Sequence, residues 1–315
     1  MSITAQMVKE LRLKSRAGMM DCKKALIEMN GDMDAAIDWL RKKGLATASK
    51  KSGRVASEGL IGISLEDNLG AIVEVNSETD FVARNQEFQK FVISISDVAI
   101  KNNGNLDKIL NSNFPNSEKN VMDTLTDKIA KIGENMSIRR SEIVSVSNGT
   151  IIGYIHNAVN ENLGKIGVLV ALESKAAKTS LQKLGKELAM HIAATSPSSI
   201  SIEDLSSELV ERERKVLIDQ AMASGKPEDI AKKMVEGRLR KFYSEVVLLE
   251  QTFVIDGETK VSDVIKKVSK ELNHDIKINS FIRYNLGEGI EKNTKNFADE
   301  VAEQLSDQFF KYINC

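Results

Sequence analysis

The chain has 315 residues, of which 42% are hydrophobic and 28% are charged, and its formal net charge is −1. This length and balance are typical of a soluble globular protein with roughly two domains. A general nucleic-acid-binding protein usually carries a clear basic excess, so the near-neutral charge argues against that class.

The first residues predict three short helices. Thr4 and Asp32 are suitable caps for the first and third helices, and Gly44 is a stop signal for the third. Three helices in so few residues form a small bundle that resembles a ubiquitin-associated (UBA-like) fold, assigned to residues 1–45. Residues 46–57 are rich in Ala, Ser, Lys and Gly and are interpreted as a helical tail or linker.

The middle of the chain contains an internal repeat. Each copy predicts a two-stranded hairpin, a helix and a closing strand, at residues 59–66, 69–76, 87–101 and 136–146 in the first copy and 151–159, 165–173, 178–194 and 276–286 in the second. Ile138-Arg139 and Ile282-Arg283 are interpreted as corresponding positions. The order predicts an α+β core of two ββαβ subdomains, residues 58–147 and 148–290.

An insertion interrupts the second copy. Residues 204–222 and 227–249 predict two long helices, and the turn Ser224-Gly225-Lys226-Pro227 between them favours an antiparallel coiled-coil hairpin, assigned to residues 203–249. Because the seam of such a hairpin buries itself, deletion of residues 204–249 is expected to leave a folded core. A last helix near residues 296–312 predicts a C-terminal helical module, residues 291–315.

Patterns that indicate catalysis or cofactor binding are missing from the sequence. The Gly287-Glu288-Gly289 run lacks the later glycine of a dinucleotide fingerprint, and no phosphate-binding loop of the type G-x-x-x-x-G-K-[ST] occurs. His156, His191 and His274 lack metal-ligand spacing, and Cys22 has no candidate base partner. These residues are interpreted as packing or surface residues, so the sequence predicts a binding protein with no catalytic, cofactor-binding or metal-binding residues.

The compartment is also predicted from what the sequence lacks. Residues Met1–Thr4 contain neither the basic nor the apolar region of a secretory signal. Apolar runs such as residues 166–172 are far shorter than the roughly 18 residues that a membrane span requires. Cys22 and Cys315 are too far apart in sequence to indicate a disulfide framework. These features predict a cytoplasmic protein.

Several runs resemble the bacterial elongation factor Ts family. They lie in order over nearly the whole chain, at Ala17–Leu26, Glu78–Ala83, Ile132–Asn135, Lys233–Arg238, Phe281–Arg283 and Gly287–Lys292. The resemblance implies an N-terminal three-helix domain, a two-part core, an inserted coiled-coil hairpin and a C-terminal helical module. That architecture agrees with the one predicted from periodicity and turns.

The resemblance also implies a function. Members of this family are guanine-nucleotide exchange factors for the translational GTPase EF-Tu and are not enzymes. They insert one loop into the GTPase domain of EF-Tu, where an aromatic residue disturbs the Mg²⁺ and phosphate site and accelerates GDP release. The residues that match this loop are Thr79, Asp80, Phe81 and Val82. The region of Met19 and Met20 matches the part that grips a helix of the same GTPase domain.

EF-Tu is therefore the implied partner. Direct binding of nucleotide, nucleic acid or membrane is not expected, and self-association stays open. Asp80, at a strand-to-helix turn, is expected to bind free backbone N–H groups and fix the loop. Residues His156 to Lys165 form a longer segment than is usual in the family, which makes a partner contact by His156 doubtful.

Patterns alone leave alternatives open. Without the resemblance, Phe81 is more often a core residue, and the same holds for Met19 and Met20. Two other classes of function remain: an adaptor whose N-terminal module binds ubiquitin-like or nascent-chain partners, and an enzyme with an unrecognised site. The internal repeat and the Thr79–Val82 match favour the exchange factor.

Overall fold

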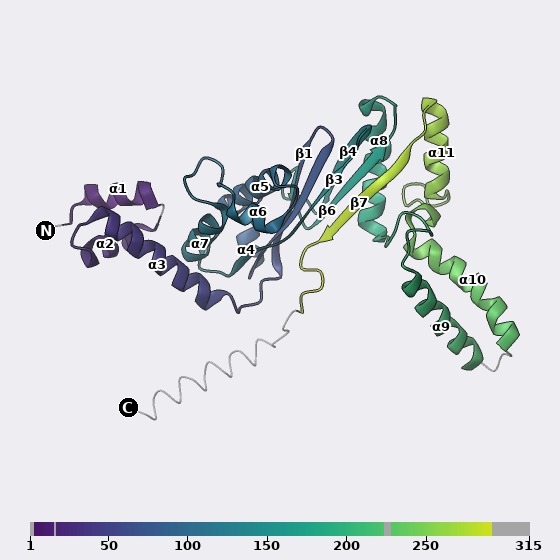
Figure 1. The fold of residues 1–315 in the computed structure, drawn as a ribbon, viewed down its shortest axis with the longest axis horizontal. Helices are drawn as coiled ribbons and strands as arrows, with labels where there is room; N and C mark the ends of the chain where they lie inside the picture. The colour runs from purple at the N-terminus through teal and green to yellow at the C-terminus, as the bar shows by residue number, and fades with distance from the viewer. Residues whose placement is uncertain (1–2, 16, 224–227, 292–315) are drawn as a thin grey trace.

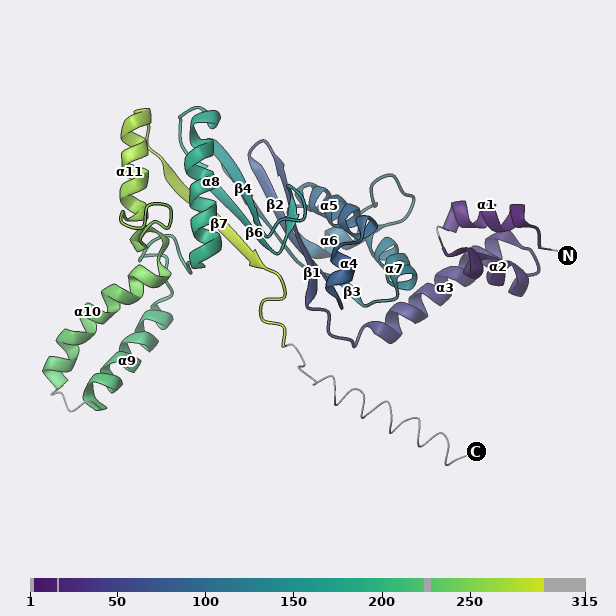
Figure 2. The same cartoon turned by 180° about the vertical axis from the view of Figure 1, so that it is seen from behind.

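A computed structural model describes residues 3–15, 17–223 and 228–291 of the chain. The molecule is elongated, with the N-terminal helices at one end, two β-sheets in the middle and a helical hairpin at the other end (Figures 1 and 2). The sequence prediction of a mixed fold with antiparallel sheets is confirmed. The expected C-terminal helix lies outside the described residues. Within them, no helix combines the length and apolarity that a bilayer crossing requires.

The N-terminal bundle consists of α1 (Ala5–Ser15), α2 (Met19–Glu28) and α3 (Met33–Lys51). These helices pack around a small buried cluster that includes Leu11, Cys22 and Leu26. Both predicted caps are confirmed, because the Thr4 hydroxyl accepts from the Met7 N–H at 3.3 Å and the Asp32 carboxylate accepts from the Ala35 N–H at 3.0 Å.

The third helix does not stop at Gly44, as the sequence predicted, but continues to Lys51. Gly44 is buried where α3 approaches α7 (Val121–Ile132), and a Cβ at this position would lie 3.8 Å from the Thr126 side chain. Residues after Gly44 include good helix formers, and Ala48 packs against the core of the first half of the molecule. Tertiary contact therefore overrides the local stop signal.

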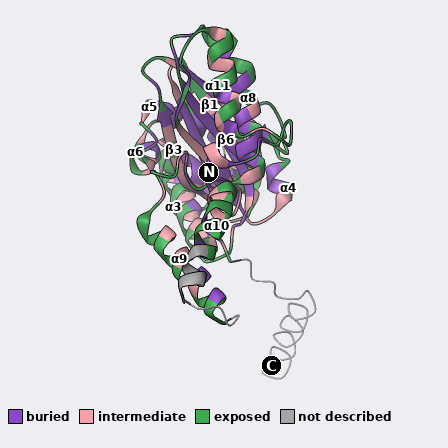
Figure 3. Cartoon of the chain, turned by 90° about the vertical axis from the view of Figure 1, so that its right-hand side faces the viewer, coloured by how far each residue is buried: buried purple, intermediate pink, exposed green. Residues whose placement is uncertain are grey.

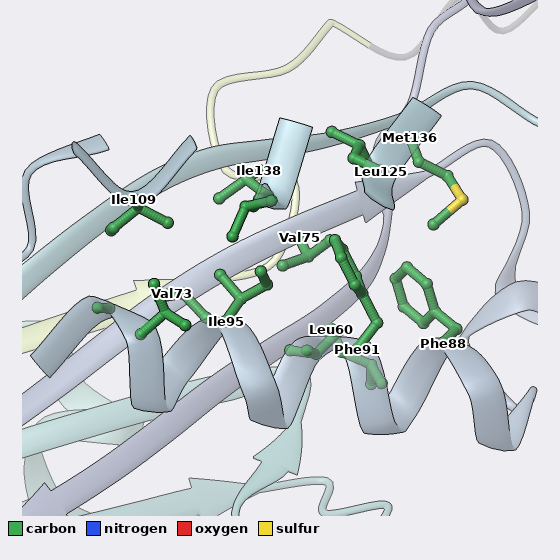
Figure 4. Close-up of a cluster of buried hydrophobic side chains, with 14 of the residues drawn as sticks. Leu60, Val73, Val75, Phe88, Phe91, Ile95, Ile109, Leu125, Met136 and Ile138 are labelled. Atoms are coloured by element: carbon green, nitrogen blue, oxygen red, sulfur yellow. The ribbon is translucent and has the colours of Figure 1, made fainter. Parts of the chain in front are cut away.

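The first half of the core contains β1 (Glu58–Glu66), β2 (Leu69–Ser77), α5 (Gln86–Lys101) and β3 (Met136–Ser145). The sheet has the order β3-β2-β1-β5, in which the short β5 (Leu163–Gly164) comes from later in the chain, and α5 covers one face of the sheet. Figure 4 shows side chains from α5 meeting strand residues in the buried cluster, among them Phe88, Phe91, Ile95, Val73 and Val75. The helices α6 (Leu106–Asn111) and α7, which close this cluster, were not predicted.

The second half contains β4 (Gly149–His156), β6 (Ile166–Glu173), α8 (Lys178–Thr195) and β7 (Lys277–Asn285). Its sheet has the order β4-β6-β7, and α8 covers its outer face. A third apolar cluster, which includes Ile61, Ile72, Ile151 and Leu169, lies between the two sheets. The core is thus a sandwich of helix, sheet, sheet and helix, and Figure 3 shows the buried residues gathered there.

Two details relate the halves of the core. Gly59 and Gly149 both have positive φ, of 125° and 144°, and a Cβ on either would collide with a backbone carbonyl of the paired strand, at Val75 and Leu172. The pairing register also shifts at these two residues. Val75 on β2 pairs with Ile138 on β3 just after the shift, and Leu172 on β6 pairs with Ile278 on β7 just after the corresponding shift. The counterpart of Ile138 is therefore Ile278, and the predicted match of Ile138 with Ile282 is wrong by four residues.

The interrupting segment contains α9 (Ser207–Ala223) and α10 (Glu228–Val246), which lie side by side and project away from the sheets (Figures 1 and 2). Their contact has its own small cluster around Leu217, Val235 and Leu239. A short 3-10 turn η1 (Leu248–Glu250) and α11 (Val261–Leu272) then lead back to β7. Val247 and Leu248 are fully buried, and Leu248 belongs to the core of the second half.

A buried carboxylate joins the two halves. Glu74 on β2 has no exposed side-chain surface and accepts hydrogen bonds from Arg139 at 3.0 Å, from Arg140 at 2.6 Å and from the Gly287 N–H at 2.9 Å. The Arg140 guanidinium also stacks 4.0 Å from the ring centre of Tyr284 on β7. Burial by itself raises the pKa of Glu74, but the hydrogen bonds from Gly287, Arg140 and Asn76 outweigh it, and the pKa lies below 4.5.

Replacement of Glu74 by Gln should lower the free energy of unfolding by about 3 kcal/mol at neutral pH, since the arginines lose their buried partner. The folded-state pKa of Glu74 is lower than the unfolded-state value, so its contribution is complete above pH 4.5 and is lost as the pH falls through the folded-state pKa. Urea unfolding of both proteins as a function of pH measures this. A difference that grows on acidification would contradict the assignment.

Deletion of the hairpin tests whether its cluster is separate from the core. Replacing residues 208–244 by a short Gly/Ser linker should preserve cooperative unfolding, because the seam around Leu217 and Leu239 lies outside the core clusters. The longer deletion of residues 204–249, which the sequence alone predicted to leave a folded core, should instead fail to fold cooperatively, since it also removes the buried Val247 and Leu248. Circular dichroism melts compare the two. Equal melting of both proteins would show that the base of the hairpin is dispensable.

Candidate functional site

The segment of residues 78–85, called here the Phe81 loop, connects β2 to α5 and contains the one-turn helix α4 (Asp80–Ala83). Val82 and Ala83 are 5% and 3% exposed and belong to the core of the first half, whereas Phe81 is 73% exposed. Successive side chains in a helix point about 100° apart, so burying Val82 and Ala83 turns Phe81 outward. The loop thus holds a large apolar ring in solvent on an anchored turn.

The amino-terminal side of the loop is held by Glu134, which follows α7. The Glu134 carboxylate accepts the Thr79 N–H at 3.0 Å and the Thr79 hydroxyl at 2.7 Å. The Ser77 hydroxyl donates to the Thr79 carbonyl at 3.0 Å. The backbone of Thr79 is therefore bound on both sides, and two of its donors converge on one carboxylate.

Glu78 and Asn135 add a second connection between the same segments. The Asn135 N–H donates to the Glu78 carboxylate, which also pairs with Arg54 at 3.4 Å. The Asn135 side-chain amide donates to the Arg54 carbonyl at 2.7 Å. The Lys51 ammonium donates to the Gly133 carbonyl. These bonds meet at the run Ile132–Asn135, one of the runs that resemble the elongation factor Ts family.

Asp80 does not have the role expected from the sequence. It is the first residue of α4, and its carboxylate pairs with Arg84 at 2.9 Å, four residues along the chain. The expected binding of a free backbone N–H in the loop is instead provided by Glu134. Arg84 lies beside the exposed ring as well, with its guanidinium 6.0 Å from the centre of Phe81. Neither the role of Glu134 nor that of Arg84 was predicted from the sequence.

Met19 and Met20 lie in the first turn of α2, at 59% and 75% exposure. Together with Ile3 and Val8 they line an apolar groove between α1 and α2, whose rim includes Lys23. The pattern-based alternative, in which these methionines are core residues, is wrong. The structure does not bring them to the Phe81 loop, because α2 lies in the terminal bundle and α4 in the core (Figure 1).

His156 ends β4 on the second sheet, and its ring accepts or donates a 3.0 Å hydrogen bond with the Tyr154 hydroxyl. The predicted strand ends there because Asn157 adopts a left-handed conformation, with φ of 51°. The lengthened segment then forms β5 (Leu163–Gly164), which adds to the edge of β1 in the first sheet. The extra residues are therefore part of the core, and Leu163 is fully buried.

Other candidate residues have structural surroundings. His191 is buried, which lowers its pKa, and its ring contacts Gln251 at 2.8 Å and the Val254 N–H at 3.2 Å. Cys22 is buried in the N-terminal bundle. The Gly287 N–H binds Glu74. In the part of the chain that the structure describes, no three His, Cys, Asp or Glu side chains gather as a metal site would require.

Comparison with known proteins gives one consistent result. The family model described as Elongation factor TS matches residues 78–288. Curated relatives named Elongation factor Ts include that of Rhodospirillum centenum, 56% identical over 300 residues that cover 95% of this chain and 98% of the relative. Those of Rhodospirillum rubrum and Bartonella henselae are 54% and 53% identical, and each comparison covers 96% of this chain and 98% of the relative.

Neighbouring residues of the loop should respond differently to truncation. Phe81→Ala should change the free energy of unfolding by less than about 0.5 kcal/mol, because the ring is in solvent. Val82→Ala should lower it by about 2 kcal/mol, because the side chain is in the core. Equilibrium denaturation in urea compares the two variants with the unmodified chain. A large loss for Phe81→Ala would place the ring inside its own domain.

Proposed function

The chain belongs to the elongation factor Ts family, and we propose that it is the guanine-nucleotide exchange factor for the GTPase EF-Tu. Membership of the family indicates a role in translation elongation. The observation that supports the finer proposal is the Phe81 ring, 73% exposed on a loop that is anchored by Val82 on one side and by Glu134 on the other. The loop of Thr79, Asp80, Phe81 and Val82 is the proposed contact with the Mg²⁺ and phosphate site of EF-Tu, in which the exposed Phe81 ring makes the contact and the buried Val82 anchors the loop.

Nucleotide exchange needs a distortion of the partner rather than a chemical step. A GTPase holds GDP through phosphate contacts and a bound Mg²⁺ ion, and release is slow because that site is well formed. An exchange protein that prefers nucleotide-free EF-Tu must weaken the binding of GDP to EF-Tu. By linkage, GDP weakens the binding of the exchange protein to EF-Tu in the same ratio. An aromatic ring on a rigid support suits this task, because it brings a large contact area at low entropic cost.

The same proposal assigns further contacts. Met19 and Met20, with the apolar groove between α1 and α2, would bind a helix of the GTPase domain of EF-Tu. His156 is not assigned a contact, because the residues after it fold onto β1. Under this proposal the protein has no enzymatic activity of its own, needs no cofactor and acts in the cytoplasm.

The proposed domain organisation follows the family. It comprises a UBA-like domain at residues 1–45, a linker at 46–57, the two core subdomains at 58–147 and 148–290, a coiled-coil insertion at 203–249 and a C-terminal helical module at 291–315. The helix α3 crosses the first of these boundaries.

Binding to EF-Tu can be tested without measuring rates. Immobilised protein should retain purified EF-Tu and lose it as GDP is added, because the two ligands oppose each other. An adaptor for other proteins would not show competition with GDP. An enzyme would turn over a substrate, whereas an exchange factor alone would not.

Phe81→Ala should reduce the second-order rate constant for stimulated GDP release from EF-Tu by about tenfold or more, as expected for a central aromatic residue of an interface. Release of labelled GDP from purified EF-Tu gives this constant. Leu65→Ala is the control, since Leu65 is also an exposed apolar residue of the first half of the core but lies at the end of β1 that is far from the Phe81 loop. Equal rates for the Phe81 variant and the unmodified protein would rule out the wedge.

A further inference from the structure

Three segments that are distant in the sequence meet at residues Ile132–Asn135, between α7 and β3. The end of α3 reaches it through Lys51, which donates to the Gly133 carbonyl. The residues before β1 reach it through the Arg54 carbonyl, bound by the Asn135 amide at 2.7 Å. The Phe81 loop reaches it through Thr79, bound by Glu134.

Within this junction we propose that Glu134 is a positioning residue for exchange, which fixes the Phe81 ring without touching the partner. The inference rests on the proposed function and adds a residue that acts through Thr79. Thr79 is the residue immediately before α4, so the backbone conformation of Thr79 sets the orientation of this one-turn helix. Glu134 binds both the N–H and the hydroxyl of Thr79, at 3.0 Å and 2.7 Å, and so fixes that start.

The other side of the turn is held independently. Val82 and Ala83 are packed in the core, and the Gln89 amide donates to the Ala83 carbonyl at 3.0 Å. Removal of the Glu134 carboxylate therefore leaves the loop attached, also through the Glu78–Asn135 bond, but releases the Thr79 N–H and hydroxyl at the start of α4. Phe81 lies between this loosened start and the retained end, so its ring would sample a wider range of positions. A ring that must be ordered on binding acts less efficiently than one already in place.

Glu134 also differs from an ordinary surface carboxylate in its geometry. Charge-assisted hydrogen bonds are stronger than neutral ones, and here Thr79 donates two of them to the carboxylate of Glu134. The bonds span 55 residues of sequence, so they tie the loop to a different part of the core. Asp80, although it belongs to the loop, pairs locally with Arg84 and cannot supply this connection.

The first experiment measures GDP release from EF-Tu at increasing concentrations of the factor. For Glu134→Ala, the maximal rate should fall about tenfold, the equivalent of one charge-assisted hydrogen bond. The concentration that gives half the maximal rate should stay unchanged, because the other contact surfaces are intact. Glu134→Gln should give an intermediate rate, since its amide can still bond Thr79. Glu118→Ala, at an exposed carboxylate of the same half, should behave like the unmodified protein.

The second experiment uses the factor alone and measures amide hydrogen exchange. In Glu134→Ala the peptide that covers residues 79–84 should exchange about tenfold faster, while peptides from α5 and β2 keep their protection. Uniformly faster exchange would show that Glu134 supports only the fold and would overturn the proposal. Unchanged exchange of the loop, or an unchanged maximal rate of GDP release, would overturn it as well.

The two experiments separate this inference from the proposed function. If the unmodified protein does not stimulate GDP release, the proposed function fails. The amide hydrogen exchange experiment still decides whether Glu134 holds the Phe81 loop. If the unmodified protein stimulates release and Glu134→Ala does so equally well, only the positioning role fails.

Discussion

The fold depends on a buried carboxylate between two sheets. Glu74 lies on the face of the first sheet that meets the second, among apolar residues, where an unpaired charge would be strongly unfavourable. It is satisfied from both halves, because Arg139 and Arg140 come from the first half and the Gly287 N–H follows the last strand of the second. The relative position of the two sheets is therefore specified by directional bonds and not only by apolar contact, which is less selective about register.

The candidate site uses the same principle at smaller scale. Apolar anchoring of Val82 and Ala83 fixes where the loop sits, and the Glu134 carboxylate fixes how it is oriented. Neither the packing nor the hydrogen bonds alone would hold the Phe81 ring in one position. Packing alone tolerates small rotations of the loop, and hydrogen bonds at the Thr79 end alone would leave the Val82 end of the loop free. Exposing a phenylalanine forgoes the free energy of burying it, and under the proposed function this surface is buried when EF-Tu covers the ring.

Features with local causes could be predicted from the sequence. The caps at Thr4 and Asp32 and most strands of the repeat follow from residue type and spacing alone. Predictions failed where a distant contact decides. Gly44 stays helical because α7 packs against it, and the bond between Thr79 and Glu134 joins residues far apart in the chain. The outward direction of Phe81 depends on which neighbours enter the core, which a pattern does not show, so only the resemblance to a family predicted it.

The two halves of the core share a plan, and the site lies where they differ. In the second half, β6 passes to α8 through residues 174–177 alone, and Ala176 in that connection is buried. In the first half, residues 78–85 lie between β2 and α5, and the added length forms the turn that carries Phe81. The connection between the helix and the third strand also differs, since the first half contains α6 and α7 there and the second half contains α9, α10 and α11. In the first half this connection supplies Glu134, just after α7, as the support for the loop that precedes α5. One copy of a repeated unit can thus acquire an exposed site if one of its connections lengthens and another connection provides the bonds that keep the first in place.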